Sequence, residues 1–227
     1  MTRHFTNFVL VFIMTMLTAN LYAQKDVTQF LGIPIDGYKS EMIQKLKSKG
    51  FTINPHKADV LDGEFNGTDV NIFIGTNNNK VWRIAIKDAN DMSEGNIKIR
   101  FNNLLQQFQN NKNYLASPDS TILKYTIPEN EDISYELTVN KKRYQAVFYQ
   151  KTAAYDSLTA EKDILMAKKS RNESDGEKIA DLIVKIFQES LKSLDKTVWF
   201  MIGESYGKYY ITIFYENVYN KANGEDL

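Results

Sequence analysis

The chain has 227 residues and equal numbers of basic and acidic side chains, 28 of each, so its formal net charge is zero. That balance gives no electrostatic basis for binding nucleic acid or an anionic membrane surface. Cysteine is absent and 43% of the residues are hydrophobic, which excludes disulfides and thiol chemistry and makes a packed core the source of stability.

Residues 1–23 have the features of a secretory signal peptide. Arg3 gives a positive start, residues 8–17 are mostly apolar, and the small residue Ala23 precedes a predicted cleavage before Gln24. The apolar run is shorter than the roughly 20 residues of a membrane span, although an uncleaved anchor is the alternative. Cleavage removes one base and no acid, which leaves 27 bases against 28 acids and a net charge of −1. We expect a periplasmic or secreted protein with no stable membrane insertion.

Residues 24–150 are predicted to hold units in which a helix precedes a set of strands. In the first unit Met42, Ile43 and Leu46 recur at helical spacing, and Gly50 suits the left-handed position that ends a helix. An Asn-Gly hairpin dipeptide and alternating apolar residues predict antiparallel strands after it. The expected extended stretches are 30–35, 60–65, 70–74 and 81–87.

The second unit begins with a helix over residues 93–108, where Ser93 is a good N-cap and the apolar residues form one stripe. Three strands are expected after this helix, because apolar residues alternate with polar ones. Their stretches are 122–127, 133–139 and 144–148.

Residues 151–176 are polar and weakly periodic, so we expect a polar linker or insertion, with a surface loop over 171–176. A final helix and hairpin over 177–217 are expected to complete the same domain, and residues 218–227 are typical of a polar tail. The helix is predicted from apolar positions 179, 182, 183, 186, 187, 191 and 194, and the hairpin from residues 197–202 and 209–216.

This order of elements predicts an α+β fold. We expect an antiparallel sheet, or sheets, with helices packed on one face, built from repeated helix-then-strands units. Whether the strands form one continuous sheet or two subdomains stays open, and residues 151–176 are the favoured seam.

Several strings behind the signal peptide carry a resemblance. They are FLGIPIDG, KSKGF, GEFNGTDVNIFI, NKVWRIAI and FNNLLQQFQNN. Together they resemble a group of uncharacterised exported proteins of Gram-negative gut anaerobes, over residues 30 to about 115. The layout is similar to β-lactamase-inhibitor-like and outer-membrane-assembly-lipoprotein-like domains. The resemblance implies a helical piece packed on an antiparallel sheet and brings no catalytic motif. The assembly lipoproteins carry a lipidated cysteine that this chain lacks, so no membrane anchor is implied.

Few side chains are suited to catalysis. His56 is the one histidine after the signal and is predicted in a solvated loop, and neither a G-x-S-x-G elbow nor a phosphate-binding glycine loop is present. We therefore expect no catalytic triad, no cofactor and no metal site. A carboxylate-only hydrolase stays open, because two suitably spaced acids suffice for glycoside hydrolysis. The candidate acids are Asp62, Glu64, Glu129, Glu131 and Asp132.

Aromatic residues on the predicted strands are the candidate binding residues. They are Trp82, Trp199, Tyr209 and Tyr210. Tyr209 and Tyr210 are adjacent, so they point to opposite faces of a strand. Exposed Tyr and Trp side chains anchor protein partners or stack on sugar rings. Aromatic residues also favour strands for packing reasons alone.

Two short strings are candidate acceptors for bacterial O-glycosylation. Asp119-Ser120-Thr121 and Asp156-Ser157-Leu158 match an Asp-Ser/Thr-apolar pattern, and both are predicted in loops or at strand edges.

Three functions follow from these observations. The leading hypothesis is a non-enzymatic exported envelope protein that binds a partner protein through a sheet surface. A carbohydrate-binding module that uses the strand aromatics is the second, and a carboxylate-only hydrolase is the third. The partner is therefore an envelope protein or a glycan.

Overall fold

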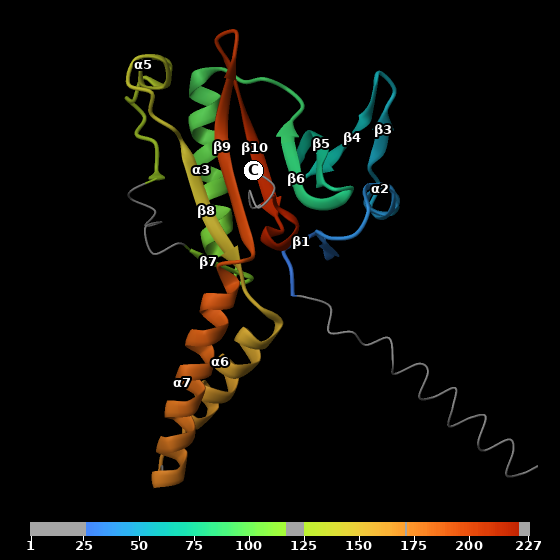
Figure 1. Cartoon of the computed structure of the whole chain (residues 1–227). Coiled ribbons are helices and arrows are strands. Elements are labelled where there is room, and N and C mark those ends of the chain that lie inside the picture. Colours follow the sequence, from blue (N-terminus) through green and yellow to red (C-terminus); the bar gives the residue numbers. More distant parts are fainter. Residues whose placement is uncertain (1–25, 117–124, 171, 223–227) are drawn as a thin grey trace, which may run out of the picture.

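The computed structural model describes residues 26–116, 125–170 and 172–222, and its centre is one antiparallel sheet of eight strands. Figure 1 shows helix α3 behind strands β8, β9 and β10 and the helices α6 and α7 extending away from the sheet. The strands of this sheet, in spatial order, are β3 (Thr52–Asn54), β4 (Lys57–Phe65), β5 (Thr68–Asn77), β6 (Lys80–Asp88), β10 (Lys208–Glu216), β9 (Thr197–Ser205), β8 (Gln145–Gln150) and β7 (Tyr114–Ala116).

The remaining elements are five α-helices, a small two-stranded sheet and a 3₁₀ turn within the described residues. The helices are α2 (Lys39–Ser48), α3 (Glu94–Asn110), α5 (Ile133–Thr138), α6 (Ala153–Met166) and α7 (Glu173–Ser193). The small sheet pairs β1 (Gln29–Phe30) with β2 (Ile33–Pro34), and the 3₁₀ turn η1 covers Val218–Asn220.

The predicted α+β fold is confirmed, and strands β3 to β10 form one continuous sheet. Strand β6 of the first unit pairs with β10 of the last hairpin, for example at Ile86 and Ile213. This pairing joins the two halves of the chain at the middle of the sheet. Tight turns connect the hairpins, and Asn66 and Gly67 both adopt the positive φ angles that the turn between β4 and β5 requires.

The core lies between the sheet and helices α2 and α3. Ser93 caps α3, and the apolar stripe of this helix is buried against aromatic side chains of β8 and β9. The ring of Phe108 stacks on Phe148 with centroids 4.9 Å apart, and Phe101 meets Phe200 edge to face at 5.0 Å. These contacts fix α3 across one face of the sheet.

Residues 151–176, predicted to be a polar linker or insertion with a surface loop over 171–176, are mostly helical, and the predicted loop is wrong from Glu173 onward. Helix α6 fills most of this stretch, and α7 already begins at Glu173. Residues 171–176, predicted as a loop, contain a capping box. The Asn172 side chain accepts from the Asp175 backbone amide, and the Asp175 carboxylate accepts from the Asn172 backbone amide. The helices form a hairpin between β8 and β9, and the stretch is polar because much of the hairpin surface faces solvent.

The predicted strand over residues 133–139 is wrong, because Ile133–Thr138 form helix α5. Asp132 caps this helix by accepting from the Tyr135 amide, at 2.8 Å. Ile133 and Leu137, four residues apart, both pack against the core, whereas Tyr135 and Val139, which alternate with them, are exposed, as helical spacing requires. Of the predicted strand 122–127, residues 122–124 lie outside the described residues and 125–127 are not in a strand.

Candidate functional site

The candidate site lies on the outer face of the sheet, defined as the face opposite helix α3. A lateral row of side chains crosses five neighbouring strands there, since each residue is the register partner of the next. All of its members are partly or largely exposed, although apolar side chains usually mark the covered face of a sheet. This outer row consists of Phe73, Ala85, Phe214, Trp199 and Val147.

Beside the outer row, Arg83 is surrounded by aromatic rings. Its guanidinium carbon lies 4.2 Å from the ring centroid of Trp82, 4.8 Å from Phe214 and 5.8 Å from Trp199. Positive charge over ring faces is attractive, and Arg stacks on rings better than Lys does. The arginine therefore holds rings from three strands in one cluster.

Glu216 fixes the orientation of that cluster. Its carboxylate accepts from the Arg83 guanidinium and from the indole Nε1 of Trp199, at 2.8 Å for the indole. The Glu216 side chain is only 8% exposed, whereas that of Arg83 is 27% exposed. The acid is thus the inner, covered partner, and the arginine is presented toward solvent.

Two glycines allow the outer aromatics to lie close to the sheet. A Cβ at Gly203 would come within 2.4 Å of the Tyr210 ring, so this ring lies flat across the backbone of β9. A Cβ at Gly75 would stand 3.4 Å from Trp82 Nε1, next to a register shift between β5 and β6. Lys87 lies over the Tyr210 ring, 3.8 Å from its centroid.

The structure brings some of the predicted binding residues together and separates others. Trp82 and Trp199 both contact Arg83, and Tyr210 shares their face farther along β10. Tyr209 does not belong to this surface, because its side chain is 4% exposed and joins the core. Arg83, Phe214 and Glu216 were missed, although strand alternation from Tyr210 would have placed Phe214 and Glu216 on the same face.

The candidate glycosylation sites are not supported as loop sites. Ser157 is exposed but lies inside helix α6, where its hydroxyl donates to the Ala154 carbonyl at 2.9 Å. Ser120 lies outside the described residues.

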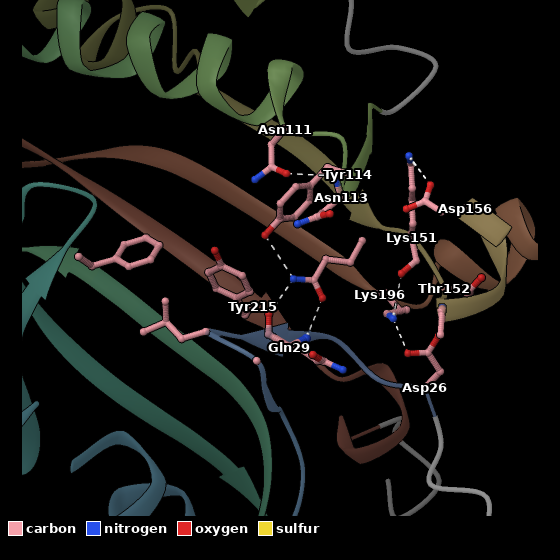
Figure 2. Close-up of a pocket in the computed structure, with 15 residues that line it drawn as sticks. Asp26, Gln29, Asn111, Asn113, Tyr114, Lys151, Thr152, Asp156, Lys196 and Tyr215 are labelled. Atoms are coloured by element: carbon pink, nitrogen blue, oxygen red, sulfur yellow. Dashed lines mark hydrogen bonds and ion pairs between the residues drawn. The ribbon is translucent and has the colours of Figure 1, made fainter. Parts of the chain in front are cut away.

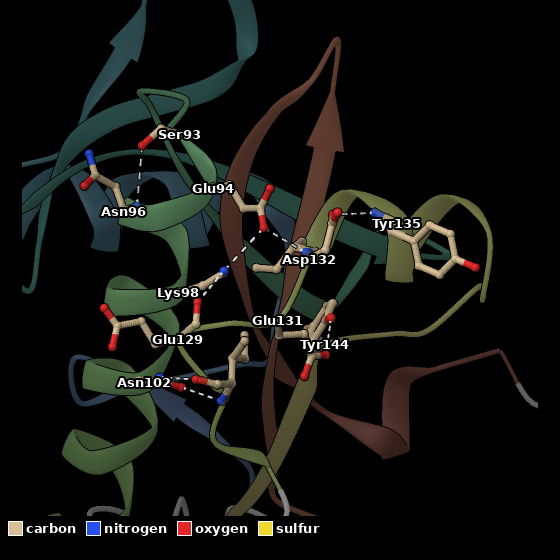
Figure 3. Close-up of polar contacts among 12 residues, drawn as sticks. Ser93, Glu94, Asn96, Lys98, Asn102, Glu129, Glu131, Asp132, Tyr135 and Tyr144 are labelled. Carbon is tan, nitrogen blue, oxygen red and sulfur yellow. Dashed lines mark hydrogen bonds and ion pairs between the residues drawn. The ribbon is translucent and has the colours of Figure 1, made fainter.

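Hydrogen bonds connect the acidic turn before α5 to helix α3, as Figure 3 shows. Glu94 of α3 accepts from the Ile133 amide at 2.9 Å, and Lys98 donates to the Glu129 carbonyl at 2.9 Å. The side-chain amide of Asn102 donates to the Ile127 carbonyl and accepts from the Ile127 backbone amide, at 2.9 Å each. These contacts are structural, because they satisfy backbone groups of the connecting segment.

Glu131 in this turn stays ionised and does not resemble a catalytic acid. Burial pushes the pKa of its carboxyl upward, but hydrogen bonds from Lys142 and Tyr144 outweigh burial and hold the pKa below its usual range. Burial and the same bond to Glu131 raise the pKa of Tyr144. The proton thus stays on the tyrosine and the charge on the acid.

The remaining candidates are also engaged or exposed. Asp62 accepts from the side-chain amides of Asn54 and Asn71, at 2.8 Å each, on strand β4. Glu64 and His56 are exposed, with His56 in the turn between β3 and β4. The described ranges contain no group of three or more His, Asp or Glu able to hold a metal ion.

A groove that the sequence did not reveal lies where the small sheet meets α3 and α6 (Figure 2). It comprises two adjoining cavities of about 570 and 420 Å³ that share Leu31, Phe65 and Tyr215 among their lining residues. The side-chain amide of Gln150 donates to the Gln29 backbone carbonyl at 2.7 Å and to the Tyr114 hydroxyl at 3.2 Å. The lining residues come from segments far apart in the chain, so no local sequence pattern could predict the groove.

Charges at the polar end of the groove are balanced in pairs. Lys196, 5% exposed, pairs with Asp26, and Lys151 pairs with Asp156 at 2.9 Å. Burial and a hydrogen bond with Tyr114 raise the pKa of Tyr215, so the phenol stays protonated. The groove has the size of a small-molecule site, but its paired charges select no particular ligand charge.

Within the described residues, no helix combines the length and the apolar character needed to cross a bilayer. The chain matches no protein-family model, and it matches neither a curated protein nor a solved structure.

Proposed function

We propose that the protein is an exported envelope protein, without catalytic activity of its own, that binds a partner protein through the outer face of its sheet. The observation that carries the proposal is the outer row, an apolar stripe that crosses five strands beside the Arg83 cluster. Trp, Tyr and Arg dominate the binding energy of protein interfaces, and this face presents all three.

The arrangement of the rings favours a protein partner over a glycan. The Trp199 ring stacks on Phe214 at 4.1 Å between centroids and 22° between planes. Rings stacked on each other have one face covered, whereas a sugar platform needs ring faces that lie free side by side. Glycan binding is therefore the second candidate, and the burial of Tyr209 removes one ring from it.

A hydrolase is not proposed. The Glu131 carboxylate accepts from Lys142 and Tyr144, the Asp132 carboxylate caps α5, and the Asp62 carboxylate is held by two asparagine amides. These contacts stabilise ionised or hydrogen-bonded carboxylates at separate places in the fold, so they do not form the facing pair that glycoside hydrolysis requires.

Differential capture tests the proposed binding face. Wild-type protein and the variants Trp82→Ala, Trp199→Ala and Tyr206→Asn are immobilised and exposed to solubilised envelope from the source cells. Tyr206 is the matched control, because it is 99% exposed at the tip of the β9–β10 turn and Asn accepts its positive φ angle.

We expect one partner protein to bind the wild type and Tyr206→Asn and to be lost from both tryptophan variants, with all four proteins folded by circular dichroism. Equal capture by all four proteins would contradict the use of this face. A glycan-array signal that only the tryptophan variants lose would favour the carbohydrate-binding alternative instead.

Export rests on residues 1–23, which lie outside the described residues. N-terminal sequencing of the protein recovered from the periplasm or the medium should begin at Gln24. Recovery from the cytoplasm with Arg3 and the apolar run intact would remove export from the proposal.

A further inference from the structure

The groove beside the small sheet has two halves of different character. Its larger cavity, about 570 Å³, is lined mostly by polar side chains, whereas the smaller one, about 420 Å³, has an apolar floor. That floor includes Phe51, Leu104 and Phe108, which are 3%, 2% and 7% exposed, and the polar side chains of this half stand at its exposed rim. Tyr114 and Tyr215 line both cavities, so the two halves are continuous. A ligand that fills the groove therefore needs one polar part and one apolar part.

The charges that line the groove cancel. In the polar half, Lys196 pairs with Asp26 and Lys151 pairs with Asp156. The rim of the apolar half adds one lysine and one glutamate. An ionic ligand would have to break one of the pairs and leave a charge uncompensated, which is costly where that charge is buried, as it is at Lys196. The groove therefore favours a ligand without net charge.

Neutral amide side chains supply hydrogen bonds along the groove (Figure 2). Asn111 Oδ1 accepts from the Asn113 backbone amide at 3.0 Å, which leaves Asn111 Nδ2 for a ligand as far as the described residues are concerned. Asn113 lines the same cavity, and its side chain is exposed. An amide side chain carries both a donor and an acceptor, as a hydroxyl group does. The polar half therefore matches a head that carries hydroxyl groups.

The backbone that borders the groove argues against a peptide as the occupant. The Gln29 amide donates to the side-chain oxygen of Gln150 at 2.7 Å, and the Gln150 side chain donates back to the Gln29 carbonyl at 2.7 Å. The Tyr114 amide donates to the Asn111 carbonyl at 3.0 Å. An extended peptide binds a strand edge through unpaired backbone groups, and these groups are already paired.

Leu31 is an unusual residue at the place where it stands. It lies in the turn between β1 and β2 with a φ angle of 51°, and Gly32 follows at 77°. Two successive positive φ angles favour Asn-Gly, and a bulky apolar residue at the first of them is strained. The Leu31 side chain is 42% exposed and lines both cavities. Strain of this kind is retained at ligand-binding sites, so Leu31 is suited to contact the apolar part of a ligand.

We propose that the groove binds an uncharged lipid. Its hydroxyl-bearing head lies beside Asn111 and Asn113 in the larger cavity, and its hydrocarbon tail lies on the apolar floor of the smaller cavity, in contact with Leu31. This inference goes beyond the proposed function and does not rest on it, because the groove and the outer row share no residue.

Titration with a small neutral amphiphile tests the proposal. The full-length sequence is expressed in an exporting host, and the purified product is titrated with octyl glucoside below its micelle-forming concentration and followed by backbone amide chemical shifts. Octanoate and octylammonium keep the chain but carry a charge, and glucose keeps the head without the chain. We expect saturable shifts at Gly32 and Asn113, with a dissociation constant about tenfold lower than that of each of the three comparison compounds.

Leu31→Asn separates a binding role from a structural one. Asn accepts the positive φ angle, so the thermal midpoint should not fall, whereas the affinity for octyl glucoside should fall by about tenfold because the apolar contact is lost. The matched control is Ile99→Asn, the same kind of change at a 61% exposed position of α3 that does not line the groove. It should leave the affinity unchanged.

Several results would overturn the proposal. Octanoate or octylammonium binding as tightly as octyl glucoside would mean that the groove does not select an uncharged head, and equal binding of glucose would indicate a sugar site without a place for a tail. Shifts confined to helix α7, where Phe187 is 61% exposed, would mean that the amphiphile only coats an apolar helix surface. The absence of saturable shifts, or an unchanged affinity in Leu31→Asn, would also contradict it.

Discussion

At the scale of single residues, Glu216 is the side chain on which the outer aromatic cluster depends most. It accepts from both Arg83 and Trp199 while its own side chain is 8% exposed. Glu216→Gln keeps the shape but leaves the Arg83 charge without its partner. We expect the free energy of unfolding to fall by about 2 kcal/mol, measured by urea denaturation.

A control variant and a double variant complete the Glu216→Gln unfolding measurement. Glu64→Gln, at an exposed position of β4, should change the free energy of unfolding by less than about 0.5 kcal/mol. Arg83→Gln combined with Glu216→Gln should recover part of the loss, because it leaves no unpaired charge. If Glu216→Gln alone were neutral, the pair would contribute nothing and the cluster would be held by ring packing.

Glu131 gives the stability of the protein a pH dependence with a definite sign. Because the folded state holds the pKa of its carboxyl below the usual value, the unfolded state binds the proton more readily. The stabilisation is therefore complete above the ordinary glutamate pKa of about 4.3 and is lost as the pH falls through the lowered value.

We expect Glu131→Gln to lower the free energy of unfolding by about 1 kcal/mol at neutral pH, and by progressively less as the pH approaches 3. Denaturant unfolding at a series of pH values measures this difference. A difference that stays constant with pH would mean that the hydrogen bonds from Lys142 and Tyr144 do not depend on the charge of Glu131.

The residue scale also shows what the sequence could and could not predict about the site. Trp82, Trp199 and Tyr210 were identified because aromatic residues on strands are candidates for contact surfaces. The error at Tyr209 was avoidable, since it shares the parity of Ile211 and Ile213, which a core-facing strand buries. The partnership of Arg83 with Glu216 was not predictable, because it joins strands that are 133 residues apart in the chain.

At the scale of elements, the capping box of α7 fixes where the longest helix begins. The Asn172 carbonyl oxygen Oδ1 accepts from the Asp175 amide at 2.8 Å, a much closer contact than the 3.5 Å of the Ser93 cap on α3. Asn172→Ala should cost about 1 kcal/mol of local stability. Faster amide hydrogen exchange in the first turn of α7, with unchanged exchange in the sheet, would check this.

The matched control for that cap is Ser174→Ala, at an exposed position two residues after Asn172 in the first turn of α7. It should leave the exchange rates of α7 unchanged. Equal fraying in both variants would mean that the end of the hairpin opens regardless of the cap.

The errors at the element scale have a common physical origin. A helix that projects into solvent has polar residues over most of its surface, so α6 and the start of α7 have the composition of a loop. Residues 133–139 carry apolar residues whose spacing suits both a strand and a short helix, and only the Asp132 cap distinguishes the two. Helix α3 and the β4–β5 and β9–β10 hairpins were predicted correctly, because caps, periodicity and turn residues agreed there.

At the scale of the whole molecule, the α6–α7 hairpin is an insertion between two strands that already pair. Tyr149 of β8 is the register partner of Thr197 of β9, and the Gln150 amide donates to the Lys196 carbonyl at 2.9 Å. Replacement of residues 152–194 by Asn-Gly keeps that register and suits a two-residue hairpin turn. We expect a folded sheet with reduced helical content, seen as one cooperative thermal transition in near-ultraviolet circular dichroism.

Excision of helix α3, residues 94–110, is the contrasting variant. It removes five buried core side chains and should prevent folding altogether. If removal of the hairpin also abolished the cooperative transition, contacts between the hairpin and the rest of the protein, such as the hydrogen bond from the Ala153 amide to Asp26 at 3.1 Å, would be essential to folding.

The pairing of β6 with β10 also determines when the sheet can form during synthesis. Strand β6 (residues 80–88) can pair with β10 only after residues 208–216 have left the ribosome. Until then β6 is the exposed edge of the four strands β3 to β6. Pairings so distant along the chain form slowly and leave the unpaired edge of the nascent protein accessible to chaperones. A polypeptide released before Lys208 would leave β6, with Trp82, Ile84 and Ile86, paired only with β5, and an exposed edge strand of this kind is where aggregation starts.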